Sequence, residues 1–91
     1  MKLEDLIDGK KTTYTITDEH GEKSSITIDK WVADLLQEML PDVHSWIQMK
    51  YELVCMKKPD LTRREKGNAI RALSQSEAQN SSNYKSLASF L

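Results

Sequence analysis

Two short runs near the start of the chain alternate apolar side chains with threonine or serine. The runs cover residues 12–17 and 24–28, and the stretch between them, residues 18–22, is polar and contains a glycine. The apolar positions in the two runs are Tyr14, Ile16, Ile26 and Ile28. Alternating runs that flank a short glycine-containing loop are typical of a β-hairpin. The pattern therefore predicts a hairpin in the first third of the chain.

The apolar spacing changes to a helical period directly after this hairpin. Apolar side chains then recur three and four positions apart, which places them on one face of a helix. They are Trp31, Val32, Leu35, Leu36, Met39 and Leu40. Asp29 is the predicted N-cap, because its carboxylate can accept hydrogen bonds from amides of the first turn. Pro41 ends the helix, since proline has no amide hydrogen to donate.

A second helix is predicted from the cap Asp42 to about Lys58, before Pro59. Its apolar positions are Val43, Ile47, Tyr51 and Val54, with Trp46 and Leu53 beside them. Residues 62–65 (Thr-Arg-Arg-Glu) form a capping-box pattern that starts a third helix, which Gly67 weakens.

From Ser74 onward the chain is mostly serine, asparagine, glutamine and alanine, which is the composition of a polar tail, either a partner site or disordered. A few apolar residues lie near the C-terminal end of this tail, and they are Tyr84, Leu87, Phe90 and Leu91.

The size of the chain limits the core that it can build. Its 91 residues make one domain, and only 38% of them are apolar. A second copy would supply the missing core, so an obligate homodimer is expected. The chain divides into an N-terminal lead with the first hairpin strand (1–22), a central core (23–58), and a weak helix with a polar tail (59–91).

Several kinds of chemistry are not expected from this sequence. No nucleophile–base set, phosphate loop or metal-ligand spacing is visible, so the chain is predicted to be no enzyme and to hold no metal or cofactor. The single cysteine, Cys55, lies in an apolar run and is expected to be a buried thiol. No apolar stretch reaches the roughly 20 residues that span a bilayer. The N-terminus lacks the apolar core of a signal peptide, so we expect a cytoplasmic protein with no membrane partner.

The net charge of −1 conceals an uneven distribution of charge. Residues 1–29 carry four basic and seven acidic side chains, whereas residues 57–71 carry six basic and two acidic ones. This basic segment is either a solvated face or a phosphate-contacting surface. In the second case the contacting residues are Lys57, Lys58, Arg63 and Arg64.

A strand with unpaired edges needs a partner, and the same strand of a second copy can supply one. The paired strands would cover the helices with one face and point Lys23, Ser25 and Thr27 outward. A two-stranded ribbon fits the major groove of DNA, where short polar side chains read base edges.

Residues 23–58 resemble the Arc/MetJ/CopG-type ribbon-helix-helix family. The resemblance rests on the alternation Ser-Ile-Thr-Ile at 25–28, the cap at Asp29, the helix start at 31–36, and the second helix start at 43–48. It implies base contacts from Lys23, Ser25 and Thr27. It also implies a phosphate clamp formed by the backbone near Val43, His44 and Ser45. The expected dimer core consists of Ile26, Ile28, Trp31, Leu35, Trp46 and Ile47.

The sequence departs from this family at three places. Leu40-Pro41-Asp42 stands where the family has a glycine-containing turn, and Asp42 puts a negative charge beside the expected phosphate. A preceding strand, residues 12–17, can pair with one edge of residues 24–28, which leaves only the other edge for a second copy.

Two functions are expected. The first is a sequence-specific DNA-binding transcriptional regulator or repressor, as found in plasmids and phages, whose dimer inserts a β-ribbon into double-stranded DNA. The alternative is an antitoxin-like protein-interaction module that binds a protein partner through the C-terminal tail and the acidic hairpin.

Overall fold

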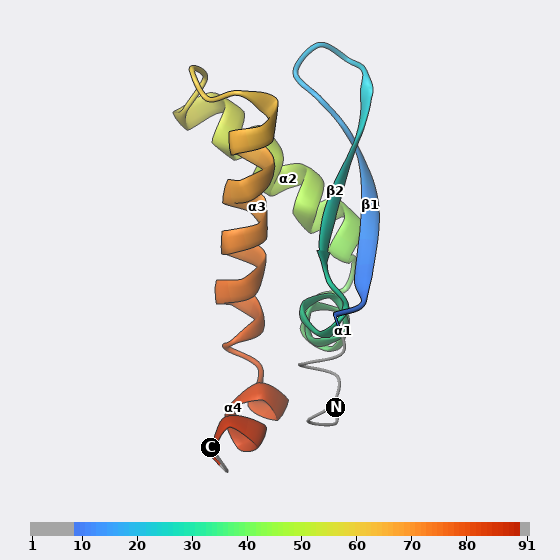
Figure 1. Cartoon of the computed structure of the whole chain (residues 1–91), viewed down its shortest axis with the longest axis vertical. Helices are drawn as coiled ribbons and strands as arrows, with labels where there is room; N and C mark the ends of the chain where they lie inside the picture. The colour runs from blue at the N-terminus through green and yellow to red at the C-terminus, as the bar shows by residue number, and fades with distance from the viewer. Residues whose placement is uncertain (1–8, 90–91) are drawn as a thin grey trace.

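The computed structural model describes residues 9–89 and shows a mainly helical domain with a two-stranded antiparallel sheet (Figure 1). The elements are β1 (Lys11–Thr17), β2 (Lys23–Asp29), α1 (Lys30–Met39), α2 (Val43–Lys57), α3 (Arg63–Ala78) and α4 (Ser82–Ala88). The start of the predicted lead, residues 1–8, and the apolar end at Phe90 and Leu91 lie outside the described residues.

The predicted hairpin is confirmed. β1 and β2 pair antiparallel, with Thr13 opposite Thr27 and Thr15 opposite Ser25. In the loop, the Asp18 carboxylate accepts hydrogen bonds from the amides of His20 and Glu22, both at 2.9 Å. Gly21 has a φ of 79°, a left-handed conformation that glycine adopts without steric cost.

The sheet buries one face against the helices, as its alternation predicts. Ile16, Ile26 and Ile28 are all at most 3% exposed, and they join Leu35 and Ile47 in one apolar cluster. The residues expected to form a dimer core are therefore packed within a single chain. Trp31 and Trp46 are half-buried against the same cluster. The burial of the four aliphatic members of this set does not require a second copy.

The N-terminal caps of the first three helices differ from one another. Asp42 caps α2 by accepting a hydrogen bond from the Ser45 amide at 3.1 Å, and the capping box of α3 at Thr62 and Glu65 is present. Both features were predicted. The side-chain cap predicted for α1 is wrong, because the Asp29 carboxylate makes no such bond and pairs instead with Lys11 across the hairpin.

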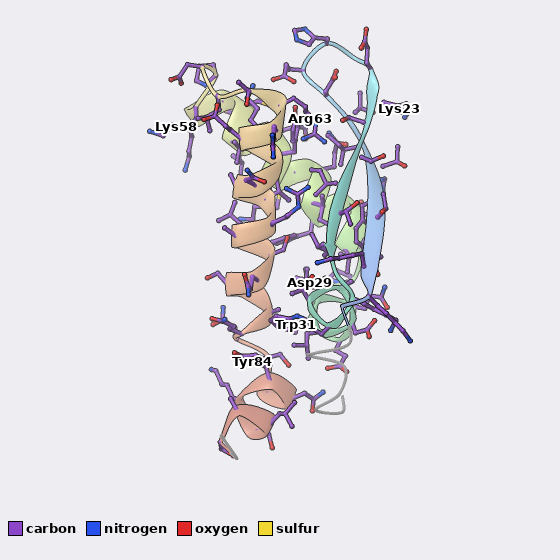
Figure 2. The ribbon with its side chains drawn as sticks, in the orientation of Figure 1. Lys23, Asp29, Trp31, Lys58, Arg63 and Tyr84 are labelled. Carbon is purple, nitrogen blue, oxygen red and sulfur yellow. The ribbon has the colours of Figure 1, made fainter. Side chains whose placement is uncertain are left out.

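The C-terminal segment, expected as a polar tail of open role, is mostly helical in its described part. α3 continues to Ala78 because Ile70, Ser74 and Ala78 recur every four residues and are all completely buried. After a short turn, α4 packs on α1, where the rings of Trp31 and Tyr84 stack with centroids 5.8 Å apart (Figure 2). The small side chains of Ser74 and Ala78 allow α3 to pack closely on the neighbouring helices, and composition alone does not reveal this.

Candidate nucleic-acid interface

The outward face of the hairpin is a ladder of short polar side chains. All three residues predicted to contact bases belong to it, since Lys23 and Ser25 are exposed and Thr27 alternates with the buried isoleucines. The Thr13 and Thr27 hydroxyl oxygens are 2.9 Å apart, and the Lys23 ammonium donates to the Thr17 hydroxyl at 3.4 Å. The face thus presents hydroxyl groups in the middle and a lysine toward each end.

The second strand of this face comes from β1 of the same chain. Thr13 and Thr15 are exposed directly opposite Thr27 and Ser25. Sequence reasoning predicted the strand but assigned no site role to these threonines, because it placed the strand of a second copy beside β2. The alternation of residues 12–17 was the signal that could have identified them.

The outer edge of β1 is covered by side chains of α2. Gln48 donates to the Thr17 carbonyl at 2.9 Å and accepts from the Thr17 amide at 2.8 Å. Two residues earlier in β1, the Thr15 carbonyl is hydrogen-bonded to a ring nitrogen of His44. These bonds satisfy backbone groups that an additional strand would otherwise use.

Two arginines of α3 cover the outer edge of β2 in the same way. Arg63 donates to the Ser25 carbonyl at 2.7 Å and to the Ser24 hydroxyl at 2.8 Å. Arg71 donates to the Thr27 carbonyl at 2.7 Å. Figure 1 shows α3 running along this side of the hairpin. Both edges of the ribbon are therefore occupied by side chains of the same chain, which opposes strand pairing with a second copy.

The start of α2, expected to clamp a phosphate, is already engaged. The Ser45 amide and hydroxyl both donate to the Asp42 carboxylate, and Val43 is buried. The hydrogen bonds from the Ser45 side chain and then its amide lower the pKa of Asp42, so this carboxylate stays charged at neutral pH. With His44 turned to the hairpin, the arrangement weighs against phosphate binding here.

The four basic residues expected to contact phosphates do not form one surface. Besides its bonds to β2, the Arg63 guanidinium lies over the Tyr51 ring, 5.2 Å from its centroid, so its role is structural. Lys57, Lys58 and Arg64 are exposed around the connection between α2 and α3. Figure 2 shows Lys58 on the side of α3 away from Lys23 and the hairpin.

The hairpin loop is fixed to the helices by one carboxylate, that of Glu19. It accepts hydrogen bonds from the Tyr51 hydroxyl at 2.7 Å and from the Cys55 thiol at 3.4 Å, and it pairs with Lys66. Lys66 is only 4% exposed. The bond from Lys66, followed by that from Tyr51, lowers the pKa of Glu19 to about 2.

The same cluster determines the state of Cys55. The thiol is half-buried, and desolvation raises its pKa, with the neighbouring Glu19 carboxylate acting in the same direction. A thiol with a raised pKa forms little of the nucleophilic thiolate. Cys55, expected as a buried thiol, is thus only half-buried, and its raised pKa disfavours the thiolate.

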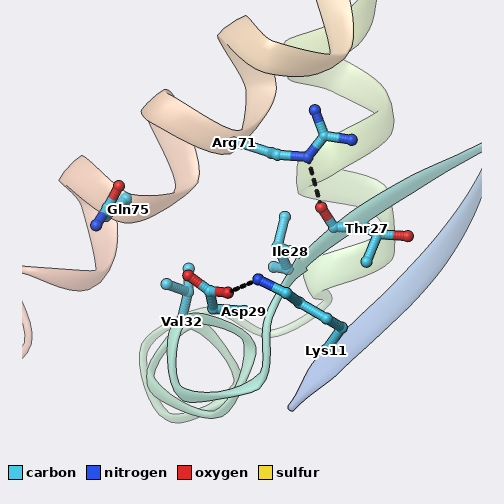
Figure 3. A pocket seen from close by; sticks show the side chains of 7 residues that line it. All are labelled: Lys11, Thr27, Ile28, Asp29, Val32, Arg71 and Gln75. Atoms are coloured by element: carbon cyan, nitrogen blue, oxygen red, sulfur yellow. Dashed lines mark hydrogen bonds and ion pairs between the residues drawn. The ribbon is translucent and has the colours of Figure 1, made fainter. Parts of the chain in front are cut away.

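A pocket of about 390 Å³ opens beside the end of the hairpin. Its charged lining residues are Lys11, Asp29 and Arg71. Figure 3 shows Arg71 reaching the Thr27 carbonyl and Lys11 paired with Asp29. Two cations and one anion give this pocket a net positive charge directly next to the polar face.

Residues 9–89 show neither a metal-binding group nor a membrane-spanning helix. No group of three or more histidine, cysteine, aspartate or glutamate side chains in this range is placed to hold a metal ion. In the same part of the chain, no helix is both long and apolar enough to cross a bilayer.

The polar face, its two occupied edges and the adjacent basic pocket are thus the features on which a function can be based. Comparison with protein-family models, with curated proteins and with solved structures finds no match for this chain.

Proposed function

We propose that the outward face of the β1–β2 hairpin binds the major groove of double-stranded DNA and that the chain is a sequence-specific transcriptional regulator. The observation that carries the proposal is the exposed pair of antiparallel strands with small hydroxyl side chains on one face. The major groove admits a two-stranded ribbon, and serine or threonine hydroxyls both donate to and accept from base edges.

Charges around this face support the same proposal. Lys11 and Lys23 lie toward opposite ends of the face, and Arg71 lies in the adjoining pocket. Basic side chains that flank a reading surface contact phosphates and fix its register on the duplex. Such contacts make affinity fall as the salt concentration rises.

The proposal keeps the two-stranded reading face of the ribbon-helix-helix family but not its phosphate clamp, and the source of the second strand differs. In that family two copies each supply one strand, whereas in this chain β1 supplies the second strand. The proposed homodimer therefore joins two complete hairpins through another surface. Two hairpins on one duplex would read two half-sites, as other dimeric regulators do.

The antitoxin-like alternative has less support from the geometry. The acidic loop uses Glu19 internally against Lys66, and the C-terminal segment is folded into α4 with Tyr84 stacked on Trp31. Both surfaces offered to a protein partner by that alternative are thus at least partly engaged.

The test compares the DNA affinity of the wild-type chain with that of a variant that lacks one hydroxyl group of the outward face. The duplex is taken from upstream of the protein's own gene, with an unrelated duplex as control, at near-physiological salt. Replacing Thr15 with alanine should weaken specific binding by about 1–3 kcal/mol, because one contact to a base edge is lost. The thermal midpoint should stay nearly unchanged, since the Thr15 side chain is exposed.

The matched control is Ser76→Ala, which removes an exposed hydroxyl from α3 and should leave affinity unchanged. Equal, salt-sensitive binding of the wild-type chain to both duplexes would contradict sequence-specific recognition. Unchanged specific affinity in the Thr15 variant would remove this residue from the reading face.

A further inference from the structure

Helix α2 carries two exposed methionines on the side opposite its buried face. One side, with Val43, Ile47 and Tyr51, is buried against the sheet and the other helices. The other side carries Met49 and Met56, which are 47% and 75% exposed. Ser45 and Glu52 are exposed on that same side, so it is a mixed surface that includes two exposed apolar side chains.

A groove of about 270 Å³ runs beside this exposed side, between α2 and α3. Its apolar lining consists of Leu53, Val54 and Leu73, of which Leu73 is 41% exposed. The remaining lining residues are three lysines, Lys50, Lys57 and Lys58, and no acidic residue lines it. The groove therefore combines an apolar floor with a purely basic rim.

We propose that this groove binds an amphipathic helix of a partner protein whose apolar residues are flanked by aspartate or glutamate. Helices bind grooves of this kind through apolar anchors spaced three and four residues apart. Acidic side chains beside the anchors would pair with Lys50, Lys57 and Lys58, which gives the complementarity that selects a partner.

The charges disfavour two other occupants. A second copy of the chain, seated symmetrically, would bring the same three lysines against one another, and like charges at an interface cost affinity. Nucleic acid would satisfy the lysines but leave the floor of Leu53 and Leu73 uncovered. The groove is also separate from the DNA-reading face, because Lys58 lies beyond α3 from the hairpin (Figure 2).

A pair of synthetic helical peptides tests the proposal with the full chain. Both carry leucines on one face, and the flanking positions are glutamate in one peptide and lysine in the other. Fluorescence anisotropy should show binding of the glutamate peptide at least about tenfold tighter than that of the lysine peptide. Reversing Lys57 and Lys58 to glutamate should invert this preference.

Leu73→Glu tests the floor of the groove. This substitution should weaken the affinity for the glutamate peptide by about tenfold or more. The control is Ala72→Glu, which adds the same charge at the neighbouring exposed position of α3 and should change affinity less than about twofold. Circular dichroism establishes that both variants are folded.

Three results would overturn the proposal. The first is that the glutamate peptide does not bind, or binds Leu73→Glu as well as wild type. The second is self-association in sedimentation that Leu73→Glu abolishes, which would assign the groove to a second copy. The third is binding to anionic lipid vesicles that depends on Leu73 in place of peptide binding. DNA affinity of the same variants is measured separately, so that either proposal can fail alone.

Discussion

Replacing Ile26 with aspartate is expected to unfold the chain. Ile26 is fully buried on the inner face of β2, inside the apolar cluster formed with α1 and α2. An ionised carboxylate placed there has no partner, and the substitution also removes a large apolar side chain. The expected loss is about 4 kcal/mol or more, which is most of the stability of a domain of this size. Circular dichroism and thermal denaturation measure it.

The control for this variant lies on the other face of the same hairpin. Thr15→Asp introduces the same charge at an exposed position of β1, and it should leave the chain folded. A cooperative thermal transition in Ile26→Asp close to that of wild type would show that β2 does not face the core. The comparison thus tests the register that also defines the proposed DNA-reading face.

Replacing Glu19 with glutamine is expected to destabilise the chain at neutral pH and to reduce the dependence of its stability on acid. The substitution leaves the buried Lys66 ammonium without its counter-charge. Because folding lowers the pKa of Glu19 from 4.5 to about 2, its ionised form stabilises the folded state. That stabilisation is fully present above pH 4.5 and is lost as the pH falls toward 2.

The measurement is the thermal midpoint of both chains between pH 2 and pH 7. At pH 7 the midpoint of Glu19→Gln should be several degrees lower than that of wild type, and the two curves should converge in acid. Glu22→Gln, an exposed acid in the same loop, should follow wild type. Adding Lys66→Met to the Glu19 variant should recover part of the loss, since the unpaired charge is then removed. Parallel curves for Glu19→Gln and wild type would contradict this assignment.

The sequence predicted those parts of the fold that depend on local patterns. The alternation at 12–17 and 24–28, the helical spacing after Asp29, and the prolines at 41 and 59 are all local signals, and the hairpin, α1 and α2 follow them. The extension of α3 depends instead on the buried Ser74 and Ala78, and α4 contacts α1 through the stacking of Tyr84 on Trp31. Composition assigned that region to a tail because it counts polar residues without their positions.

The candidate site divides in the same way. Alternation alone was sufficient to place Ser25 and Thr27 on the outward face. The bonds from Arg63 and Arg71 to β2 join residues 38 and 44 positions apart, and no local pattern indicates them. The basic run in the sequence therefore predicts a phosphate-binding surface, whereas Arg63 within it donates hydrogen bonds to β2.

The coverage of the β2 edge by α3 also has a consequence for synthesis of the chain. The strand emerges from the ribosome 44 residues before Arg71, and its edge stays uncovered during that interval. An open edge with isoleucines on one face is the kind of segment that joins other nascent chains. Completion of α3 therefore ends the period in which the growing polypeptide is prone to aggregate, and translation speed through residues 30–71 sets how long that period lasts.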